Sequence, residues 1–410
     1  MSLVSPSMRR RLLHIVTQAT VGGATLGTLE AAFGLREHFE VHVACGEVTD
    51  PDYALINRAM RDLPFHVVPE LRRQINPVND VRGLRALKRL VHGIGPDVVH
   101  THSSKAGVLG RDAAARAGIP SVHSVHGWGH TPLDGALRRR VLVLAERWAA
   151  TRCHLIAAVS SDVRDEGLSL NIGRPEQYRI VPEWVDLTPS YTNHAAGRQA
   201  AREAIGLSAE VPVIGWVGRF VPQKDPRTLA RMLIRTLRDE RSAIAVLIGD
   251  GPDMELVRRT TAAGGCGERV KFLGLCDDVR RLLPAFDVVV HTSRWEGHPR
   301  VVQEAIAERV PVVTARVSGV SDILVDDRVG RAVSPGDSDA FAVACGQYLA
   351  HRHRYVPIDE DAIAAVARTN GAAASMKAHL GMYEELLGVA GPVGAARRAH
   401  GDPPRPGGKS

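Results

Sequence analysis

Apolar and polar positions alternate along the chain in two successive series. In the first, short apolar runs occupy residues 12–17, 41–45, 65–68, 97–102, 121–127 and 155–160, and segments such as 81–91 and 137–149 have helical spacing. After a polar stretch, a second series has apolar runs at 211–220, 243–251, 270–274, 287–293 and 310–315. Strands that alternate with helices in this way predict parallel, doubly wound sheets. We therefore predict an α/β protein with two domains.

The segment 286–307 contains the most informative pair of residues. Residues 286–290 predict a buried strand, residues 293–298 are polar, and apolar positions from 301 to 306 recur at helical spacing. Ligands of open parallel sheets bind beyond the carboxyl ends of the strands. Glu296 in the loop and Glu304 in the helix, with seven residues between them, can therefore face one site.

The residues between these two glutamates favour binding by the backbone. Pro299 stands where the first helical residue is expected, a position that needs no amide proton. The amides around Gly297 and His298 then remain free to bind oxygens or anions.

A glycine-rich loop follows the first predicted strand and contains Gly22, Gly23 and Gly27. Glycines there let backbone amides approach a phosphate or a sugar closely, although a structural turn explains a Gly-Gly pair equally well. The spacing is not the GxGxxG of dinucleotide-binding oxidoreductases.

Two cations follow the first strand of the second series. Arg219 lies at the predicted strand end, and Lys224 lies just before the next predicted helix. Together they suit a diphosphate, whose charge must be neutralised as it leaves. Gly249 follows the next strand and is expected in a turn at the rim of the same crevice.

Histidines follow two strands of the first series. His102 is the last residue of its strand, and Ser103 next to it is expected first of all as a helix cap. We predict His102, Ser103 and Lys105 as polar lining of the crevice, because no further ligand cluster at a recognisable spacing supports a metal site. His126 ends the next strand and points toward the crevice, with structural and catalytic roles equally open.

The amino-acid composition restricts the classes of ligand and the location that we expect, but it does not identify a ligand. The net charge of +7 favours anionic ligands, among them phosphate, lipid headgroups or nucleic acid. Asp50 and Asp52 form a DxD-like pair, yet Pro51 between them favours an exposed turn over a metal site. The five cysteines lack paired spacing, so we expect neither a disulfide framework nor zinc. With no long apolar run and no signal peptide, we expect a cytoplasmic protein.

Taken together, these segments resemble the retaining glycosyltransferases of family 4, over about residues 11 to 389. EGHPRVVQE is similar to the family's paired-glutamate motif, and VGRFVPQKDP to its phosphate-binding segment. INPVND, VHTHSSKAGVLGR and SVHGW are similar to members that build polysaccharide or glycolipid, or that decorate natural products. The resemblance implies the GT-B fold: two facing Rossmann-like, doubly wound parallel-sheet domains with a C-terminal crossover helix.

The resemblance also implies a role for each candidate residue. Glu304 would hold the ribose hydroxyls of a nucleotide-sugar donor, most simply a UDP-sugar, and Glu296 would lie beside the sugar. The amides of Gly297 and His298, at the turn before Pro299, would bind sugar hydroxyls. The remaining candidates would stabilise the diphosphate (Arg219, Lys224), close over it (Gly22, Gly23) or approach the sugar (His126). No metal or other cofactor would be needed.

The resemblance divides the chain into segments of different function. Residues 1–185 would bind the acceptor, residues 186–375 would bind the donor, and residues 376–390 would form the crossover helix. Residues 391–410 would be a disordered basic tail. The acceptor would be a hydroxyl of a lipid-linked saccharide or a natural product.

The chain departs from the family pattern at three positions. Glu183 and Trp184 replace a common Asn-Gly turn at the interdomain junction, where they would alter the hinge. His298 replaces a usually apolar residue, so its side chain is a candidate for adjusting the choice of sugar. Residues 318–322 replace a commoner Gly-Gly and Glu pattern, which leaves Asp322 without an implied role.

Two basic patches raise the question of membrane contact. One comprises Arg82, Arg85, Lys88 and Arg89, and the other residues 138–140. Either could touch anionic lipid at the inner face of a membrane, and either could be a solvated helix face.

Other function classes remain as alternatives. A nucleotide-sugar epimerase of the same architecture would isomerise sugar without an acceptor. A nicotinamide-dependent oxidoreductase is disfavoured by the missing GxGxxG motif. A noncatalytic binder of polyanions or membranes would leave the paired glutamates without a purpose, and no nucleic-acid partner is predicted.

Overall fold

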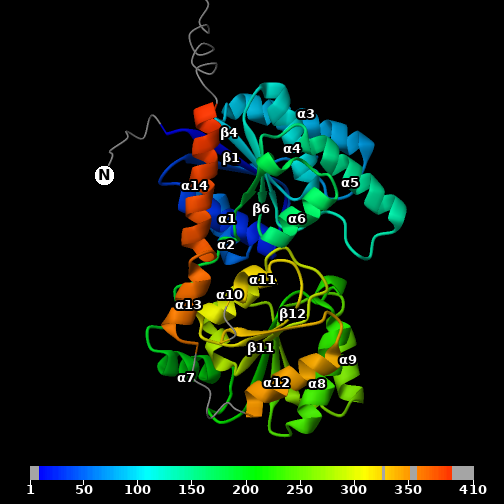
Figure 1. Cartoon of the computed structure of the whole chain (residues 1–410), viewed down its shortest axis with the longest axis vertical. Coiled ribbons are helices and arrows are strands. Elements are labelled where there is room, and N and C mark those ends of the chain that lie inside the picture. Colours follow the sequence, from blue (N-terminus) through cyan, green and yellow to red (C-terminus); the bar gives the residue numbers. More distant parts are fainter. Residues whose placement is uncertain (1–8, 326–327, 351–357, 390–410) are drawn as a thin grey trace, which may run out of the picture.

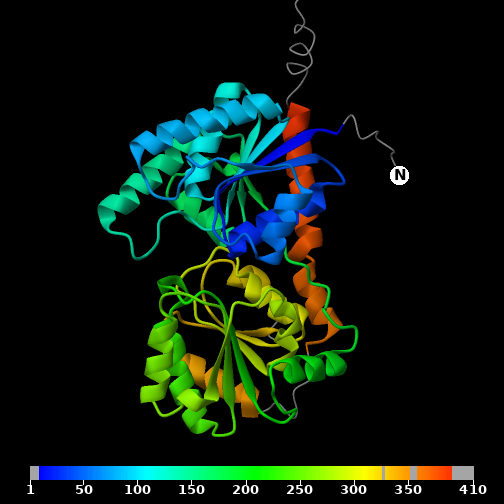
Figure 2. The same ribbon diagram turned by 180° about the vertical axis from the view of Figure 1, so that it is seen from behind.

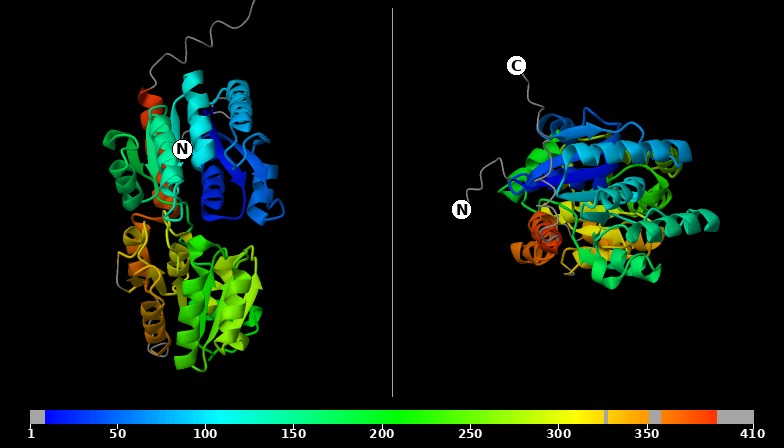
Figure 3. Two further views of the ribbon diagram at one scale, coloured as in Figure 1. Left: turned by 90° about the vertical axis from the view of Figure 1, so that its right-hand side faces the viewer. Right: turned by 90° about the horizontal axis from the view of Figure 1, so that it is seen from above.

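The computed structural model describes residues 9–325, 328–350 and 358–389, and it consists of two α/β domains stacked along the longest axis (Figures 1 and 3). Each domain is built on one parallel sheet, with strand order β3-β2-β1-β4-β5-β6-β7 in the first and β10-β9-β8-β11-β12-β13 in the second. In each order the chain reverses direction beside the first strand of the domain, as in doubly wound folds. The predicted architecture of two Rossmann-like domains is confirmed.

The N-terminal domain contains seven strands and seven helices of the described chain, counting α14. Its strands are β1 Arg11–Ala19, β2 Glu40–Val48, β3 Phe65–Val67, β4 Val98–His102, β5 Ser121–Val125, β6 Leu155–Ala158 and β7 Tyr178–Ile180. Its helices are α1 Gly23–Leu35, α2 Ala54–Asp62, α3 Pro77–Ile94, α4 Ser104–Ala117, α5 Ala136–Ala150, α6 Ser161–Ser169 and α14 Gly371–Val389.

The C-terminal domain begins after a connecting segment that contains the predicted boundary at residue 185. Its strands are β8 Val213–Val217, β9 Ile244–Ile248, β10 Val270–Gly274, β11 Val288–His291, β12 Val312–Ala315 and β13 Gly330–Val333. Its helices are α7 His194–Ala204, α8 Pro226–Asp239, α9 Met254–Ala263, α10 Arg300–Ala307, α11 Val320–Ile323, α12 Ser338–Ala350 and α13 Glu360–Ala367.

Helix α14 returns from the second domain to the first. Its residues Met382, Tyr383 and Leu386 are buried in the same cluster as Leu29 and Leu35 of α1. Figure 2 shows α14 along the flank of the N-terminal domain. The crossover helix is therefore confirmed, and it begins at Gly371, earlier than the predicted residue 376. The tail predicted at residues 391–410 lies outside the described residues.

The two domains exchange helix caps where their sheets face each other. The Asp322 carboxylate accepts hydrogen bonds from the amide and hydroxyl of Ser161, at 2.8 and 2.7 Å, at the start of α6. In return, the Asp162 carboxylate accepts from the Gly319 amide, at 2.9 Å, at the start of α11. Carboxylates at helix N-termini are favourable because they satisfy free amides and oppose the helix dipole. These hydrogen bonds therefore hold the loops after β6 and β12 together across the two domains.

Candidate functional site

Two loops of the C-terminal sheet bring Lys224 and Glu296 together. Lys224 follows β8 and Glu296 follows β11, and these strands are hydrogen-bonded neighbours. The Lys224 Nζ donates to Glu296 Oε1 at 2.5 Å. Gln223 Nε2 donates to the carbonyl of Trp295 at 3.1 Å, which holds the two loops in register. The sequence predicted both residues, and the structure brings them together.

The Glu296 carboxylate stays ionised despite its burial. Burial alone would raise its pKa, but the charge of Lys224 and the hydrogen bonds from His291 and Lys224 hold the pKa well below its usual range. His291 lies 3.4 Å from Glu296 Oε1, and its other ring nitrogen bonds Thr314 at 2.8 Å. The site therefore presents a fixed negative group beside a fixed positive group.

Arg219 and Gly249 follow β8 and β9, two neighbouring strands of the same sheet. Arg219 is exposed. The hydrogen bond from the Val21 amide lowers the pKa of Asp50 in the opposite domain, and the charge of Arg219 adds to this shift. Gly249 has φ +126°, and a Cβ there would overlap the carbonyl oxygen of Gly218. The glycine therefore allows the β9 loop to pack closely on the segment that carries Arg219.

The Gly297 peptide packs directly on the N-terminal domain. A Cβ on Gly297 would overlap the carbonyl oxygen of His126, and the Gly297 carbonyl accepts from Ser160 Oγ at 2.8 Å. Within the described residues, the amides of Gly297 and His298 donate no hydrogen bond, as expected for a backbone binding site. Pro299 is the N-cap residue rather than the first helical residue, because its ψ of 110° is extended.

His126 ends a chain of hydrogen-bonded histidines. Its Nδ1 lies 2.6 Å from Glu183 Oε1, and its Nε2 lies 3.0 Å from Nδ1 of His102. The Nε2 of His102 in turn lies 2.9 Å from Nδ1 of His14. If Nδ1 of His126 donates to the carboxylate, the alternation of nitrogens fixes every ring as the Nδ1–H tautomer. His14 Nε2 is left without a partner among the described residues.

This arrangement changes the expected position of His102. Its side chain is buried behind His126, so it does not line a crevice surface as predicted. His14, His100 and His102 also place three ring nitrogens within 4.8 Å of one another. Both ring nitrogens of His100 and of His102 are engaged in hydrogen bonds, with His100 bonded to Tyr383 at 2.6 Å and to Ser124 at 2.8 Å, whereas only Nδ1 of His14 has a partner among the described residues. The sequence did not predict this cluster.

The His298 ring lies in the interdomain hinge. Its Nε2 lies 2.8 Å from Asn370 Oδ1, and its Nδ1 lies 3.4 Å from the Glu183 amide and 3.1 Å from Gln303 Nε2. Both nitrogens therefore have protein partners, and the ring is buried. The hinge residues thus occupy both polar atoms of the ring, and its predicted effect on the choice of donor sugar stays a prediction.

Glu304 lies beside an arginine that joins the two domains. Arg300 Nη2 lies 3.6 Å from Glu304 and 2.8 Å from Glu30 of α1, and Nη1 donates to the carbonyl of Trp184. Burial raises the pKa of Glu30, although the arginine charge opposes this shift. Arg300 thus connects the predicted ribose-binding glutamate to the N-terminal domain.

The glycine loop meets Arg300 from the other side. A Cβ on Gly23 would lie 3.3 Å from Arg300 Cδ, whereas one on Gly22 would meet nothing within 4 Å. A carboxylate oxygen of Asp50 accepts from the Val21 amide at 2.9 Å and fixes the start of this loop. Asp50 therefore supports the loop, a role that the interpretation as an exposed turn missed.

Ser103 and Lys105 have structural partners. Ser103 occupies the N-cap of α4 but makes no side-chain cap, because its hydroxyl bonds Thr17 at 2.7 Å instead. Lys105 Nζ pairs with Asp80 of α3 at 2.6 Å. The prediction that Ser103 caps α4 is therefore wrong, and the ammonium group of Lys105 is held by an ion pair with α3.

Comparisons with known proteins place this geometry in a family. The sequence model described as Glycosyltransferase Family 4 matches residues 21–189, and the one described as Glycosyl transferases group 1 matches residues 211–351. The D-inositol 3-phosphate glycosyltransferase of Xylanimonas cellulosilytica is 32% identical over 286 residues, covering 66% of this chain and 68% of that protein. The chain belongs to glycosyltransferase family 4. It is a glycosyltransferase, so the epimerase, oxidoreductase and noncatalytic alternatives are set aside.

Further similarities of this family 4 chain concern sequence and fold. The UDP-Gal:alpha-D-GlcNAc-diphosphoundecaprenol alpha-1,3-galactosyltransferase of Escherichia coli is 29% identical over 315 residues, covering 75% of this chain and 79% of that enzyme. HepE of Anabaena, crystallised with UDP and glucose, has a TM-score of 0.77 at 21% identity, covering 91% of this chain and 99% of that chain. The GT-B fold is thereby confirmed.

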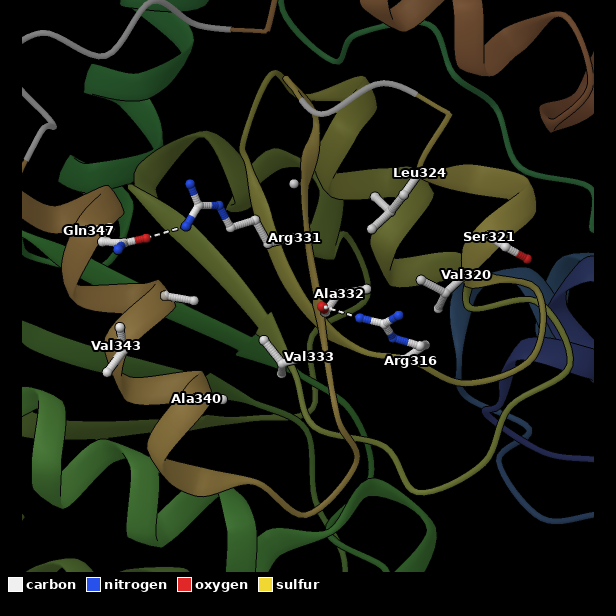
Figure 4. A pocket seen from close by; sticks show the side chains of 12 residues that line it. Arg316, Val320, Ser321, Leu324, Arg331, Ala332, Val333, Ala340, Val343 and Gln347 are labelled. Carbon is white, nitrogen blue, oxygen red and sulfur yellow. Dashed lines mark hydrogen bonds between the residues drawn. The ribbon is translucent and has the colours of Figure 1, made fainter.

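One hollow of this glycosyltransferase lies away from the candidate residues. Its volume is about 690 Å³, and it lies beside the edge strand β13 and helix α12 (Figure 4). Arg331 and Gln347 form a hydrogen bond across it, and Arg316 donates to the carbonyl of Ala332. None of the predicted site residues lines it.

Three charged residues of the family 4 site were missed as functional partners. They are Glu183, Arg300 and Asp322, each of which contacts the opposite domain, Glu183 through its amide at 3.4 Å from His298 Nδ1. Two of them, Glu183 and Asp322, stand where the chain departs from the family pattern, and that departure was their only signal in the sequence. Arg300 gave no separate signal, because it lies inside the paired-glutamate motif.

Proposed function

We propose that the protein transfers a sugar from a nucleotide-diphosphate donor, a UDP-sugar, to an acceptor hydroxyl with retention of anomeric configuration and without a metal ion. The pairing of Lys224 with Glu296 carries this proposal. It sets a cation for the leaving diphosphate beside an ionised carboxylate at the sugar side.

The comparisons support the choice of donor and acceptor. The Escherichia coli relative is named for a UDP-galactose donor and a diphosphoundecaprenol acceptor, and HepE was crystallised with UDP-glucose. By analogy, the acceptor here is a lipid-linked saccharide, with a natural product as the second candidate. A 2-deoxystreptamine N-acetyl-D-glucosaminyltransferase of Streptomyces fradiae, 28% identical over 277 residues, motivates that candidate.

The proposed chemistry is a front-face substitution. The bond between the anomeric carbon and the phosphate oxygen breaks while the acceptor oxygen bonds to the same face of that carbon. The acceptor proton passes to the departing phosphate, whose negative charge Arg219 and Lys224 stabilise. The free amides of Gly297 and His298 bind sugar hydroxyls, Gly22 and Gly23 close over the diphosphate, and Glu304 binds the ribose hydroxyls.

His126 and the protein surface complete the proposal. The His126 ring, held by Glu183 and His102, approaches the donor sugar, and the His126 carbonyl lies next to Gly297. Among the described residues, no helix is long and apolar enough to cross a bilayer. We propose that the protein contacts the inner face of an anionic membrane peripherally, because the proposed acceptor is lipid-linked.

A thermal-shift panel of UDP, GDP and ADP identifies the base of the donor, because a ligand bound only by the folded state raises the melting temperature.

Two substitutions test the site. Glu296→Gln is expected to lower kcat by about 100-fold, and Glu304→Ala to raise the donor KM by about tenfold. Glu360→Gln, an exposed carboxylate on α13, is the control. Wild-type rates in both folded variants would refute the site.

The same assay tests metal independence. Turnover is expected to persist after treatment with EDTA. A complete loss of turnover that magnesium restores would contradict this part of the proposal.

A further inference from the structure

Helix α5 exposes an apolar stripe to solvent. Leu137, Val141, Leu144 and Trp148 are 78%, 53%, 51% and 43% exposed, respectively. Their spacing of four, three and four residues places them on one side of the helix. The residues that pack onto the domain lie on the opposite side: Val143, Glu146, Ala149 and Ala150. The helix thus has one face that the fold buries and a second apolar face that it does not.

Arginines flank the exposed stripe on both sides. At about 100° per residue, Arg138 lies on one side of the stripe, and Arg140 and Arg147 lie on the other. Arg138 pairs with Asp134 of the preceding loop at 2.7 Å, and Arg147 donates to the carbonyl of Leu170.

No negative charge of α5 opposes these arginines on the outer face. The only carboxylate of α5 belongs to Glu146, which points inward and pairs with Arg111 at 2.5 Å. The outer face of α5 is therefore apolar at its centre and positive at its margins.

We propose that this face of α5 docks the protein on an anionic lipid surface. A helix that lies in a membrane interface buries an apolar stripe among the acyl chains, while flanking arginines extend to anionic headgroups. Leu133, 56% exposed in the loop before α5, extends the apolar surface beyond the helix. Of the predicted basic run 138–140, only Arg138 and Arg140 flank this apolar face, because Arg139 lies toward the domain side of the helix.

A second copy of the chain is the competing occupant. A two-fold contact would place the same stripe against itself and bring the flanking arginines of both copies close together. That arrangement is repulsive, because among the described residues only Arg138 of these arginines has a carboxylate partner, Asp134, and the charges of Arg140 and Arg147 stay uncompensated. Charge therefore favours lipid over self-association.

The position of α5 links docking to the candidate site. The loop 126–135 connects β5 to α5, and its first residue is His126. Figures 1 and 2 show α5 on the flank of the N-terminal domain opposite α14. A lipid-anchored acceptor would thus approach along the loop that carries His126. This use of the surface rests on the proposed function, whereas docking itself does not.

Vesicle sedimentation of the full chain tests the proposal. The probe is phosphatidylcholine vesicles with about a third phosphatidylglycerol, alongside vesicles of phosphatidylcholine alone. Wild type is expected to bind the anionic vesicles, and Leu137→Glu/Val141→Glu is expected to reduce its partition coefficient at least about tenfold. Arg138→Gln/Arg140→Gln should weaken binding to the anionic vesicles only. Val343→Glu on α12, 52% exposed, is the matched control and should bind as wild type does.

Three results would overturn the proposal. They are absence of wild-type binding to anionic vesicles, equal binding by Leu137→Glu/Val141→Glu, and a wild-type dimer that this variant converts to a monomer. Transfer to a water-soluble acceptor should be the same for wild type and the variant. If neither transfers sugar while vesicle binding is intact, the proposed function fails and docking stands.

Discussion

Single residues show which parts of the site a sequence can predict. Lys224 and Glu296 follow strands that a doubly wound order makes neighbours, so their encounter follows from the topology. Glu183 lies at the junction between the domains. It bonds His126, which is 57 residues away in the sequence, and no direct pairing of their strands predicts this contact. The contact depends on how the segment after β7 runs past the end of β5 within the N-terminal domain, which local pattern does not specify.

Glu183 is expected to act as a positioning residue for His126. Burial would raise the pKa of Glu183, but the attraction and hydrogen bond of His126 hold the pKa below its usual range, so the carboxylate is charged. Glu183→Gln should lower kcat about tenfold with little change in donor KM, because the neutral amide no longer fixes the ring tautomer.

Nitrogen NMR of His126 distinguishes positioning from general destabilisation. The protonated nitrogen should be Nδ1 in wild type and become mixed in Glu183→Gln, while Glu183→Asp should partly restore kcat. Glu385→Gln alters an exposed carboxylate that pairs with Arg179 in the same domain and should change neither quantity. Unchanged kcat and tautomer in Glu183→Gln would remove this role.

Elements were predicted well where the apolar run was long. The central strands, such as β4 and β11, are buried throughout, and both were predicted. The edge strands β7 and β13 were missed, because Tyr178–Ile180 has three residues and Gly330–Val333 contains a glycine and an arginine. Edge strands need apolar residues on fewer sides, so their pattern is weaker.

The exchanged caps between α6 and α11 are a prediction at this scale. Asp322→Ala removes the carboxylate from the first turn of α6 and should lower the free energy of unfolding by about 1 kcal/mol. Asn193→Ala removes a cap within one domain and should have a similar effect on stability. Only Asp322→Ala should accelerate hydrogen exchange in the first turn of α6. Equal exchange in both variants would show that the cap does not join the domains.

At the scale of the whole molecule, the N-terminal domain holds many uncharged imidazoles. Burial lowers the pKa of His14 to about 3 and that of His379 to about 4, and it holds the pKa values of His100, His102 and His123 well below the usual 6.5. These five histidines are visible in the sequence. Their common burial is not, because it depends on β1, β4 and α14 meeting on one face of the sheet and, for His123 of β5, on α4 packing on the other face.

These histidines should make the fold labile to acid. Below about pH 6.5 the unfolded chain takes up protons that the folded chain does not, so stability is present above that pH and is lost as the pH falls toward the folded pKa values. Each group contributes about 1.4 kcal/mol per pH unit within that window. Urea unfolding between pH 7.5 and pH 5 measures the slope.

Two variants check the source of this slope. His379→Phe should reduce it by about one group's share, and His38→Gln, at an exposed position, should leave it unchanged. A pH-independent free energy of unfolding in wild type over this range would contradict the explanation.

The return of α14 to the first domain has a consequence for synthesis on the ribosome. Tyr383 bonds His100, and Met382 and Leu386 fill the cluster around α1, so residues near the end of the chain complete the domain that is made first. Domains generally fold as they emerge, starting from the N-terminus. Here the first domain cannot complete its core until the entire second domain has been translated. Until then, an apolar face and the histidines that α14 covers are exposed to solvent. The second domain is in effect an insertion into the first.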